Sequence, residues 1–146
     1  MRKERRMIMN TKTYTTLPQE AKDIRIEVFV KEQGFENEFD EIDTISHHIV
    51  AFDERKPIGT CRFFKENDHY TIGRVAVLKE YRNQHIGNLL LESAENEIKK
   101  LNGDLIVVHA QVRIHPFYEK QGYIQFGQID DDEGVPHMWM KKKIQY

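Results

Sequence analysis

The residues best suited to chemistry lie between Arg74 and Leu90, where an apolar strand pattern runs into a polar loop and then into an amphipathic helix. The first amides of a helix lack partners within it and lie at the positive end of its dipole, so such a junction binds anions. Arg82 adds a forked guanidinium suited to phosphate oxygens, and Gly87 permits close backbone approach. An ordinary connection between a strand and a helix would show the same pattern. The pattern predicts a diphosphate site at seven consecutive residues: Arg82, Asn83, Gln84, His85, Ile86, Gly87 and Asn88.

This loop differs from the common nucleotide-binding motifs. It lacks Gly-x-x-x-x-Gly-Lys-Ser/Thr and does not match Gly-x-Gly-x-x-Gly. It resembles the acyl-CoA-binding loop of the GCN5-related N-acetyltransferase (GNAT) family, in which Gln/Arg-x-x-Gly-x-Gly/Ala follows a Val-x-Val-like strand. Arg82 and Gly87 fit this pattern, whereas His85 stands where the family usually has glycine. Histidine accepts left-handed backbone angles better than most residues, and its imidazole could itself touch a phosphate.

Further segments carry the same resemblance, which covers about residues 11 to 144. Residues 107–111 followed by 116–123 are similar to the family's buried strand and its Phe-Tyr-x-x-x-Gly-Phe segment. Residues 25–33 are similar to the ElaA- and YjcF-like bacterial branch of the family. Residues 134–140 are similar to that branch and to the glyphosate N-acetyltransferases.

The resemblance implies an enzyme that transfers an acetyl group from acetyl-CoA to an amine by direct attack in a ternary complex, with no metal. The pantetheine arm would lie along Val75, Ala76 and Val77 and pair with their main chain. Two residues outside the loop, Gln111 and Phe117, are also expected at the CoA site. Gln111 could donate to the acyl oxygen or cap the end of its strand.

Two side chains match the positions that handle protons in the family. Tyr118 would protonate the departing thiolate, and His137 would take a proton from the amine, since histidine titrates near neutral pH. Each has an alternative interpretation. Tyr118 could be a core tyrosine with a satisfied hydroxyl, and His137 could be a structural histidine at the base of a hairpin.

The acceptor is expected to contact Glu32 within the ElaA/YjcF-like segment and three residues downstream of it, Asp40, Asp43 and His47. Carboxylates over residues 32–43 would favour a cationic amine if they border the acceptor cleft, and would otherwise form a solvated loop. Glyphosate-type enzymes bind an anionic acceptor with arginines. Gly73 and Gln111 stand at the matching positions here, so an anionic acceptor of that kind is not expected.

Apolar periodicity places these residues on alternating elements. Residues 21–33 read as a helix, begun by Thr16, Pro18 and Gln19 and ended by Gly34, although they also alternate like a strand. Residues 35–43 should form a loop or a short helical turn. An apolar stripe predicts a helix over 86–101, and a two-turn helix follows at 116–122. Strands are expected at 11–15, 48–52, 58–64, 70–78, 105–108, 123–129 and 137–143, with 130–134 as an acidic turn. The order predicts an α/β three-layer sandwich with a mixed, mostly antiparallel sheet.

Length and composition set the remaining limits. A chain of 146 residues, 39% hydrophobic, fits one domain, expected at 11–146 after a flexible extension over 1–10. The net charge of −2 does not favour binding to nucleic acid or anionic membranes. Cys61, the one cysteine, excludes an intramolecular disulfide and reads as a small buried residue.

These features predict a cytoplasmic bacterial protein whose partners are acetyl-CoA and a small amine. Family members often form dimers, so the resemblance leaves a homodimer open. Two other functions stay open at this point. One is a CoA-binding regulatory module that has lost catalysis, motivated by His85, and the other is a nucleic-acid-binding protein, prompted by the basic residues 2–6.

Overall fold

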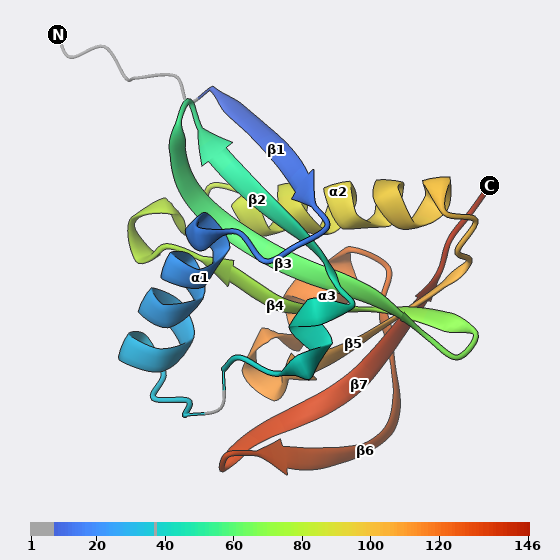
Figure 1. Cartoon of the computed structure of the whole chain (residues 1–146). Coiled ribbons are helices and arrows are strands. Elements are labelled where there is room, and N and C mark those ends of the chain that lie inside the picture. Colours follow the sequence, from blue (N-terminus) through green and yellow to red (C-terminus); the bar gives the residue numbers. More distant parts are fainter. Residues whose placement is uncertain (1–7, 37) are drawn as a thin grey trace, which may run out of the picture.

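A seven-stranded sheet forms the centre of the computed structural model, which describes residues 8–36 and 38–146. Its strand order is β1-β2-β3-β4-β5-β7-β6 (Figure 1), and every neighbouring pair is antiparallel except β4 and β5. This is the mixed, mostly antiparallel sheet that the sequence predicts. The strands are β1 (Met9–Tyr14), β2 (His47–Asp53), β3 (Lys56–Glu66), β4 (His69–Val77), β5 (Leu105–Gln111), β6 (Ile124–Asp132) and β7 (Val135–Lys143).

Helices cover both faces of the sheet and complete the predicted α/β sandwich (Figure 1). Neighbouring residues of a strand point to opposite faces, so Ile49 packs in the cluster that contains α2, whereas Val50 packs in the cluster that contains α1. The predicted stripe on α2 is confirmed, since Leu90, Ala94 and Ile98 are fully buried. The helical elements are α1 (Gln19–Arg25), the π-helix η1 (Ile26–Glu32), the 3₁₀ turns η2 (Glu41–Thr44), η3 (Lys79–Tyr81) and η4 (Val112–Ile114), α2 (Ile86–Lys100) and α3 (His115–Lys120).

The parallel pair β4 and β5 separates along its length. The two strands pair only from Tyr70 opposite Ile106 to Ile72 opposite Val108, although β4 continues to Val77 and β5 to Gln111. The register of β3 against β4 shifts nearby, and Arg74 on β4 has a left-handed φ of 52°. A bulge of this kind bends a strand away from its neighbour. The carboxyl halves of both strands therefore face an open gap.

Some local predictions need correction. The helix expected over 21–33 is present but begins at Gln19, and its second half is π-helical. Pro18, expected in the first helical turn, is instead the extended residue before it, with φ −80° and ψ 157°. Thr16 and Gln19, expected to begin this helix, do not cap it: no side-chain hydrogen bond caps α1, and the Gln19 amide donates to Asp23 instead.

The start of the first strand and the turn of the last hairpin also differ from the predicted bounds. Strand β1 begins at Met9, two residues before the predicted domain boundary, and residues 1–7 of the predicted extension lie outside the described residues. Residues 130–132, expected in a turn, belong to β6, and the turn is Glu133–Gly134, with φ of 51° and 79°. Two residues with positive φ make the tight turn that suits a twisted hairpin. In residues 8–36 and 38–146, no helix is long and apolar enough to cross a membrane.

Candidate active site

A cavity of about 1320 Å³ occupies the gap between β4 and β5. It brings together both predicted catalytic residues and nearly all of the predicted CoA contacts. Gln84 is the exception, since it does not line the cavity and its side chain instead donates to the carbonyl of Glu80. The predicted residues that line it are Val75, Ala76, Val77, Arg82, Asn83, His85, Ile86, Gly87, Asn88, Gln111, Phe117, Tyr118 and His137, together with Glu32 and Asp40.

The amino end of α2 forms one end of this cavity. His85 precedes the helix with left-handed angles, φ 64° and ψ 22°, as expected of a residue that stands in place of glycine. No side-chain hydrogen bond caps α2 within the described part of the chain. The first amides of the helix are therefore available to a ligand, and the helix dipole favours an anion there.

Arg82 is held at the same end by an acidic partner. Its two terminal nitrogens donate to both oxygens of Glu32, at 2.6 and 2.7 Å, and its Nε donates to the carbonyl of Val77 at 3.1 Å. The hydrogen bond from Arg82 lowers the pKa of Glu32, which keeps the carboxylate charged. Glu32, predicted as an acceptor contact, therefore lines the cavity but binds the guanidinium that was expected to face the diphosphate.

Gly87 lines the cavity and also packs against the ring of Phe117. A Cβ at this position would lie 3.2 Å from Cζ of Phe117, closer than carbon atoms normally pack. The Phe117 ring in turn contacts the Tyr118 ring edge-on, with centroids 5.0 Å apart. The glycine thus lets α3 approach α2, and this approach positions Tyr118.

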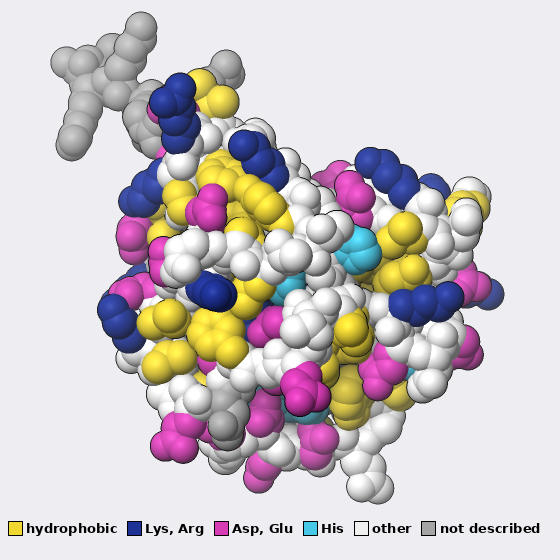
Figure 2. Space-filling view, in the orientation of Figure 1, with side chains coloured by type: hydrophobic (Ala, Val, Ile, Leu, Met, Phe, Trp, Pro, Cys, Tyr) yellow, Lys and Arg dark blue, Asp and Glu magenta, His cyan; other side chains and the backbone are white. Residues whose placement is uncertain are grey.

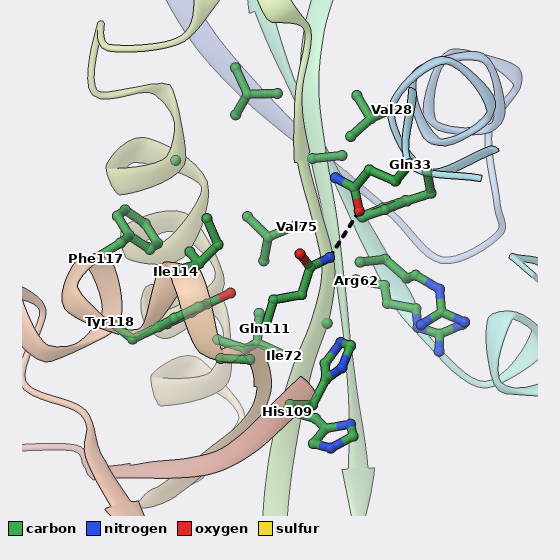
Figure 3. A pocket seen from close by; sticks show the side chains of 18 of the residues that line it. Val28, Gln33, Arg62, Ile72, Val75, His109, Gln111, Ile114, Phe117 and Tyr118 are labelled. Atoms are coloured by element: carbon green, nitrogen blue, oxygen red, sulfur yellow. Dashed lines mark hydrogen bonds between the residues drawn. The ribbon is translucent and has the colours of Figure 1, made fainter. Parts of the chain in front are cut away.

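Tyr118 lies against the gap with its hydroxyl unused. The side chain is 8% exposed and packs edge-on against Tyr123. The hydroxyl makes no hydrogen bond with any residue between 8 and 146 that the structure describes, and Figure 3 shows it pointing toward the middle of the cavity. Burial raises the pKa of Tyr118. The phenol is therefore protonated across the physiological range and free to donate.

His137 is fixed in a tautomer suited to a base. Its Nδ1 lies 2.8 Å from the carbonyl oxygen of Val135. A carbonyl only accepts, so Nδ1 carries a proton, and in the neutral ring Nε2 keeps its lone pair. The ring lies 4.8 Å from that of His109, which stacks on Trp139 and bonds Asp130 at 2.7 Å. The sequence analysis missed His109 and Asp130, because only the pairing of three strands brings them to His137.

A series of hydrogen-bonded side chains crosses the gap between β4 and β5. Nε2 of Gln111, at the end of β5, donates to Oε1 of Gln33 at 2.9 Å, and Arg113 donates to Oε1 of Gln111 at 3.0 Å (Figure 3 shows the first bond). Gln33 follows η1, which packs on β4. Gln111 therefore braces the two sides of the gap. Gln33 belongs to the ElaA/YjcF-like segment, but its partner lies 78 residues away.

Several carboxylates of the acidic segment after Gln33 form ion pairs with arginines. Arg25, 1% exposed, bonds Glu38 at 2.7 Å and Asp43 at 2.8 Å. Arg62 bonds Asp40 at 2.7 Å and Asp43 at 2.8 Å, and Arg74 adds a contact to Glu38 at 3.3 Å. The solvated loop expected here is therefore wrong for the buried Glu38 and Asp43, whereas the alternative short helical turn is present as η2. A contact between this segment and the acceptor stays a prediction.

Charge balance follows from this network. Three carboxylates, Glu38, Asp40 and Asp43, meet three arginines, so the cluster has no net charge. Burial opposes the ionisation of Asp43, but the hydrogen bonds from its arginines outweigh burial and lower its pKa to about 2. Asp43 lies within the network and does not line the cavity, whereas Asp40 does.

Further acidic side chains lie outside this network. Figure 2 shows acidic side chains over the lower part of the view, where Figure 1 places the β6–β7 hairpin. The amide of Glu36 bonds the carboxylate of Glu133 at 3.0 Å, which ties the loop after η1 to the turn of that hairpin. Asp132 and Glu133 line the cavity there. The rim on this side is thus acidic, although the buried network is neutral.

Two other predicted residues lie outside the site. His47, predicted as an acceptor contact, stacks on Phe63 with centroids 4.8 Å apart and does not line the cavity. It points to the α2 face because its neighbour His48 bonds the carbonyl of Asp43 on the other face. Cys61 is buried as predicted, and burial raises its pKa to about 12, which leaves it unsuited to act as a nucleophile.

Comparison with known proteins agrees with this geometry. Residues 14–144 match the acetyltransferase (GNAT) domain family. The N-acetyltransferase YjcF of Bacillus subtilis is 34% identical over 122 residues, which span 82% of this chain and 87% of YjcF. The chain therefore belongs to the GNAT family of N-acetyltransferases, as the sequence motifs predict.

Solved structures show the same fold. The crystal structure of Escherichia coli ElaA superposes with a TM-score of 0.82 at 22% identity, over 92% of this chain and 99% of that one. An aminoglycoside 6'-N-acetyltransferase complexed with coenzyme A superposes with a TM-score of 0.71 at 17% identity, over 86% and 89% of the two chains. The predicted resemblance to the ElaA- and YjcF-like proteins is confirmed, and the similarity of the tail to glyphosate N-acetyltransferases stays a prediction.

Proposed function

We propose that the protein transfers the acetyl group of acetyl-CoA to the amine of a small molecule or to an exposed amino group. The amine attacks the thioester directly in a ternary complex. The observation that carries the proposal is a single cavity that joins the uncapped amino end of α2 to Tyr118 and His137. An anion site, an acid and a base within one gap are the groups that acyl transfer from a diphosphate-bearing thioester requires.

The donor would use both sides of this gap. The diphosphate would accept hydrogen bonds from the first amides of α2, near Ile86 to Asn88, and from Arg82. Beyond Ile72, β4 has no partner in β5, so the main chain at Val75 and the amide of Val77 are open to pairing with the pantetheine arm, while the carbonyl of Val77 accepts from Arg82. The thioester would then lie beside Tyr118.

The residues handle two protons. As the amine nitrogen bonds to the carbonyl carbon, Nε2 of His137 takes the proton that the amine loses. As the carbon–sulfur bond breaks, the phenol of Tyr118 gives its proton to the sulfur, which leaves as a thiol. Solvent then restores both residues to their starting state.

The acceptor would enter from the side of η1 and the β6–β7 hairpin. Of the residues predicted to contact it, Asp40 stays a candidate, because it lines the cavity, is partly exposed and lies beside the neutral network. Asp132 and Glu133 at the rim favour an acceptor that carries positive charge, and no cluster of unpaired arginines among the described lining residues favours an anionic one.

An acceptor screen tests the proposal. The protein is incubated with acetyl-CoA and a panel of amines, and the release of free thiol is followed. We expect turnover with at least one amine and none without an amine. Thermal stabilisation by CoA with no turnover on any amine would contradict catalysis and would support a CoA-binding module.

A further inference from the structure

Arg113 fixes the orientation of two amide groups in the cavity. A guanidinium only donates hydrogen bonds, so the atom of Gln111 that lies 3.0 Å from Arg113 Nε must be its oxygen. The nitrogen of Gln111 therefore faces Gln33, and the atom of Gln33 that receives it at 2.9 Å must be an oxygen. The chain of bonds thus has one direction, and it ends at the NH₂ group of Gln33.

This NH₂ group is free to bind a ligand. The side chain of Gln33 forms no hydrogen bond other than that to Gln111 with any residue in 8–36 or 38–146. Its side chain lines the cavity, and Figure 3 shows its nitrogen turned away from Gln111. Two N–H donors that face the cavity and bond no described residue can donate to an oxygen atom of a bound ligand.

The position of Gln33 indicates which oxygen that is. Gln33 follows η1 on the α1 face, whereas the proposed diphosphate site lies at α2 on the opposite face. A pantetheine arm that starts at α2 and passes between β4 and β5 carries its acyl group to the α1 face. The acyl group then emerges between Val75 and the pair formed by Gln33 and Gln111.

We propose that Gln33 donates a hydrogen bond to the carbonyl oxygen of the bound acetyl group, and that Arg113 acts through Gln111 to aim this donor. Negative charge builds on that oxygen as the amine attacks, and a donor already in place stabilises it. Gln33 is then a catalytic residue, and Arg113 is a positioning residue. This inference rests on the proposed acetyl transfer.

Substitution of Gln33 tests its role in the rate. Gln33→Leu removes the donors with little change in volume, and we expect kcat to fall on the order of 100-fold while KM for acetyl-CoA changes little. Gln125→Leu, on the exposed strand β6, is the matched control and should leave the rate unchanged. A rate for Gln33→Leu equal to that of the control would overturn the proposal.

Infrared spectroscopy separates a contact with the carbonyl from a structural brace. Acetyl-CoA labelled with ¹³C at the carbonyl is bound without acceptor, and its stretching band is compared in the wild type and Gln33→Leu. We expect a lower frequency in the wild type, because a hydrogen bond weakens the C=O bond. Equal frequencies in two proteins that both bind acetyl-CoA would overturn the role of Gln33 alone. Failure of the wild type to bind acetyl-CoA would instead contradict the proposed function.

A double-mutant cycle tests the role of Arg113. Arg113→Met removes the donor that orients Gln111, so we expect a smaller loss of kcat than in Gln33→Leu. If Arg113 acts only through the chain of amides, its substitution should have no further effect in the Gln33→Leu background. Multiplicative losses in the double variant would show that Arg113 acts by another route and would overturn its assignment.

Discussion

At the scale of single residues, the surroundings of Tyr118 define its proposed task. Its ring packs edge-on against the rings of Phe117 and Tyr123, whereas its hydroxyl has no partner among the described residues and faces the cavity. Tyr118→Phe removes the proton but keeps the packing. We expect kcat to fall about 100-fold, in the range typical of a lost general acid. Calorimetric titration should give a nearly unchanged Kd for acetyl-CoA, and an unchanged kcat would remove the acid role.

His137 should control the pH dependence of the reaction. A base must be unprotonated to accept the amine's proton, so the rate should fall in acid. In His137→Ala we expect this acidic limb of the kcat/KM profile to disappear and the rate to drop most near neutral pH. His115→Ala, which alters a half-buried histidine of α3 that does not line the cavity, serves as control. A profile identical to that of the wild type would count against His137 as the base.

The limits of prediction at this scale follow from sequence distance. Tyr118 and His137 could be predicted as site residues because each belongs to a recognisable local motif. Gln33, His109 and Arg25 were not, because their partners lie 78, 21 and 18 residues away. No local pattern distinguishes Arg25, which is buried among carboxylates, from an arginine on the solvated side of a helix.

At the scale of elements, the network around Asp43 joins α1, η2, β3 and β4. The folded-state pKa of Asp43, about 2, lies below its ordinary value of 3.8. The carboxylate therefore stabilises the fold above about pH 4, and this contribution is lost as pH falls toward 2. Asp43→Asn should lower the free energy of unfolding by about 2 kcal/mol at pH 6.

Denaturant unfolding between pH 2 and 6 measures this effect. The difference in the free energy of unfolding between the wild type and Asp43→Asn should become smaller toward low pH. Asp131→Asn, on the exposed strand β6, should unfold with nearly the wild-type free energy at any pH. A difference in unfolding free energy that stays constant with pH would contradict the stabilising role assigned to the Asp43 charge.

The contact between α2 and α3 is tested at Gly87. A methyl group in Gly87→Ala would press on Phe117 at 3.2 Å and push the ring away from α2. Overpacking of this kind costs about 1 kcal/mol, so we expect CoA to bind about 5-fold more weakly. Phe117→Leu in the same chain makes room for the methyl group and should recover part of the affinity. Titration calorimetry with CoA measures both, and equal affinity of Gly87→Ala and wild type would contradict the contact's role.

Elements with strong local signals were predicted well. The apolar stripe placed α2 within one residue of its observed end, and the alternating strands gave the correct order of elements. The sequence did not reveal the π-helical turn of η1 or the strand character of residues 130–132. Three aspartates in a row indicate a turn, but pairing with β7 overrides that preference, with Asp132 opposite Val135.

At the scale of the whole molecule, the gap between β4 and β5 connects the two faces of the sheet. The amino end of α2 lies on one side, and η1 with the β6–β7 hairpin lies on the other (Figure 1). Donor and acceptor can therefore approach from opposite faces and meet beside Tyr118 and His137. Sequence motifs predicted the family and its fold, but the width and lining of this passage depend on a bulge at Arg74 that no motif encodes.

Nuclear magnetic resonance during titration with CoA tests the central claim most directly. If the diphosphate binds at the amino end of α2, the backbone amide resonances of residues 82–88 should shift most, together with those of residues 75–77 along β4. Residues of β1, at the far edge of the sheet, should shift little. Saturable binding that leaves residues 82–88 unmoved, or no binding at all, would contradict the account.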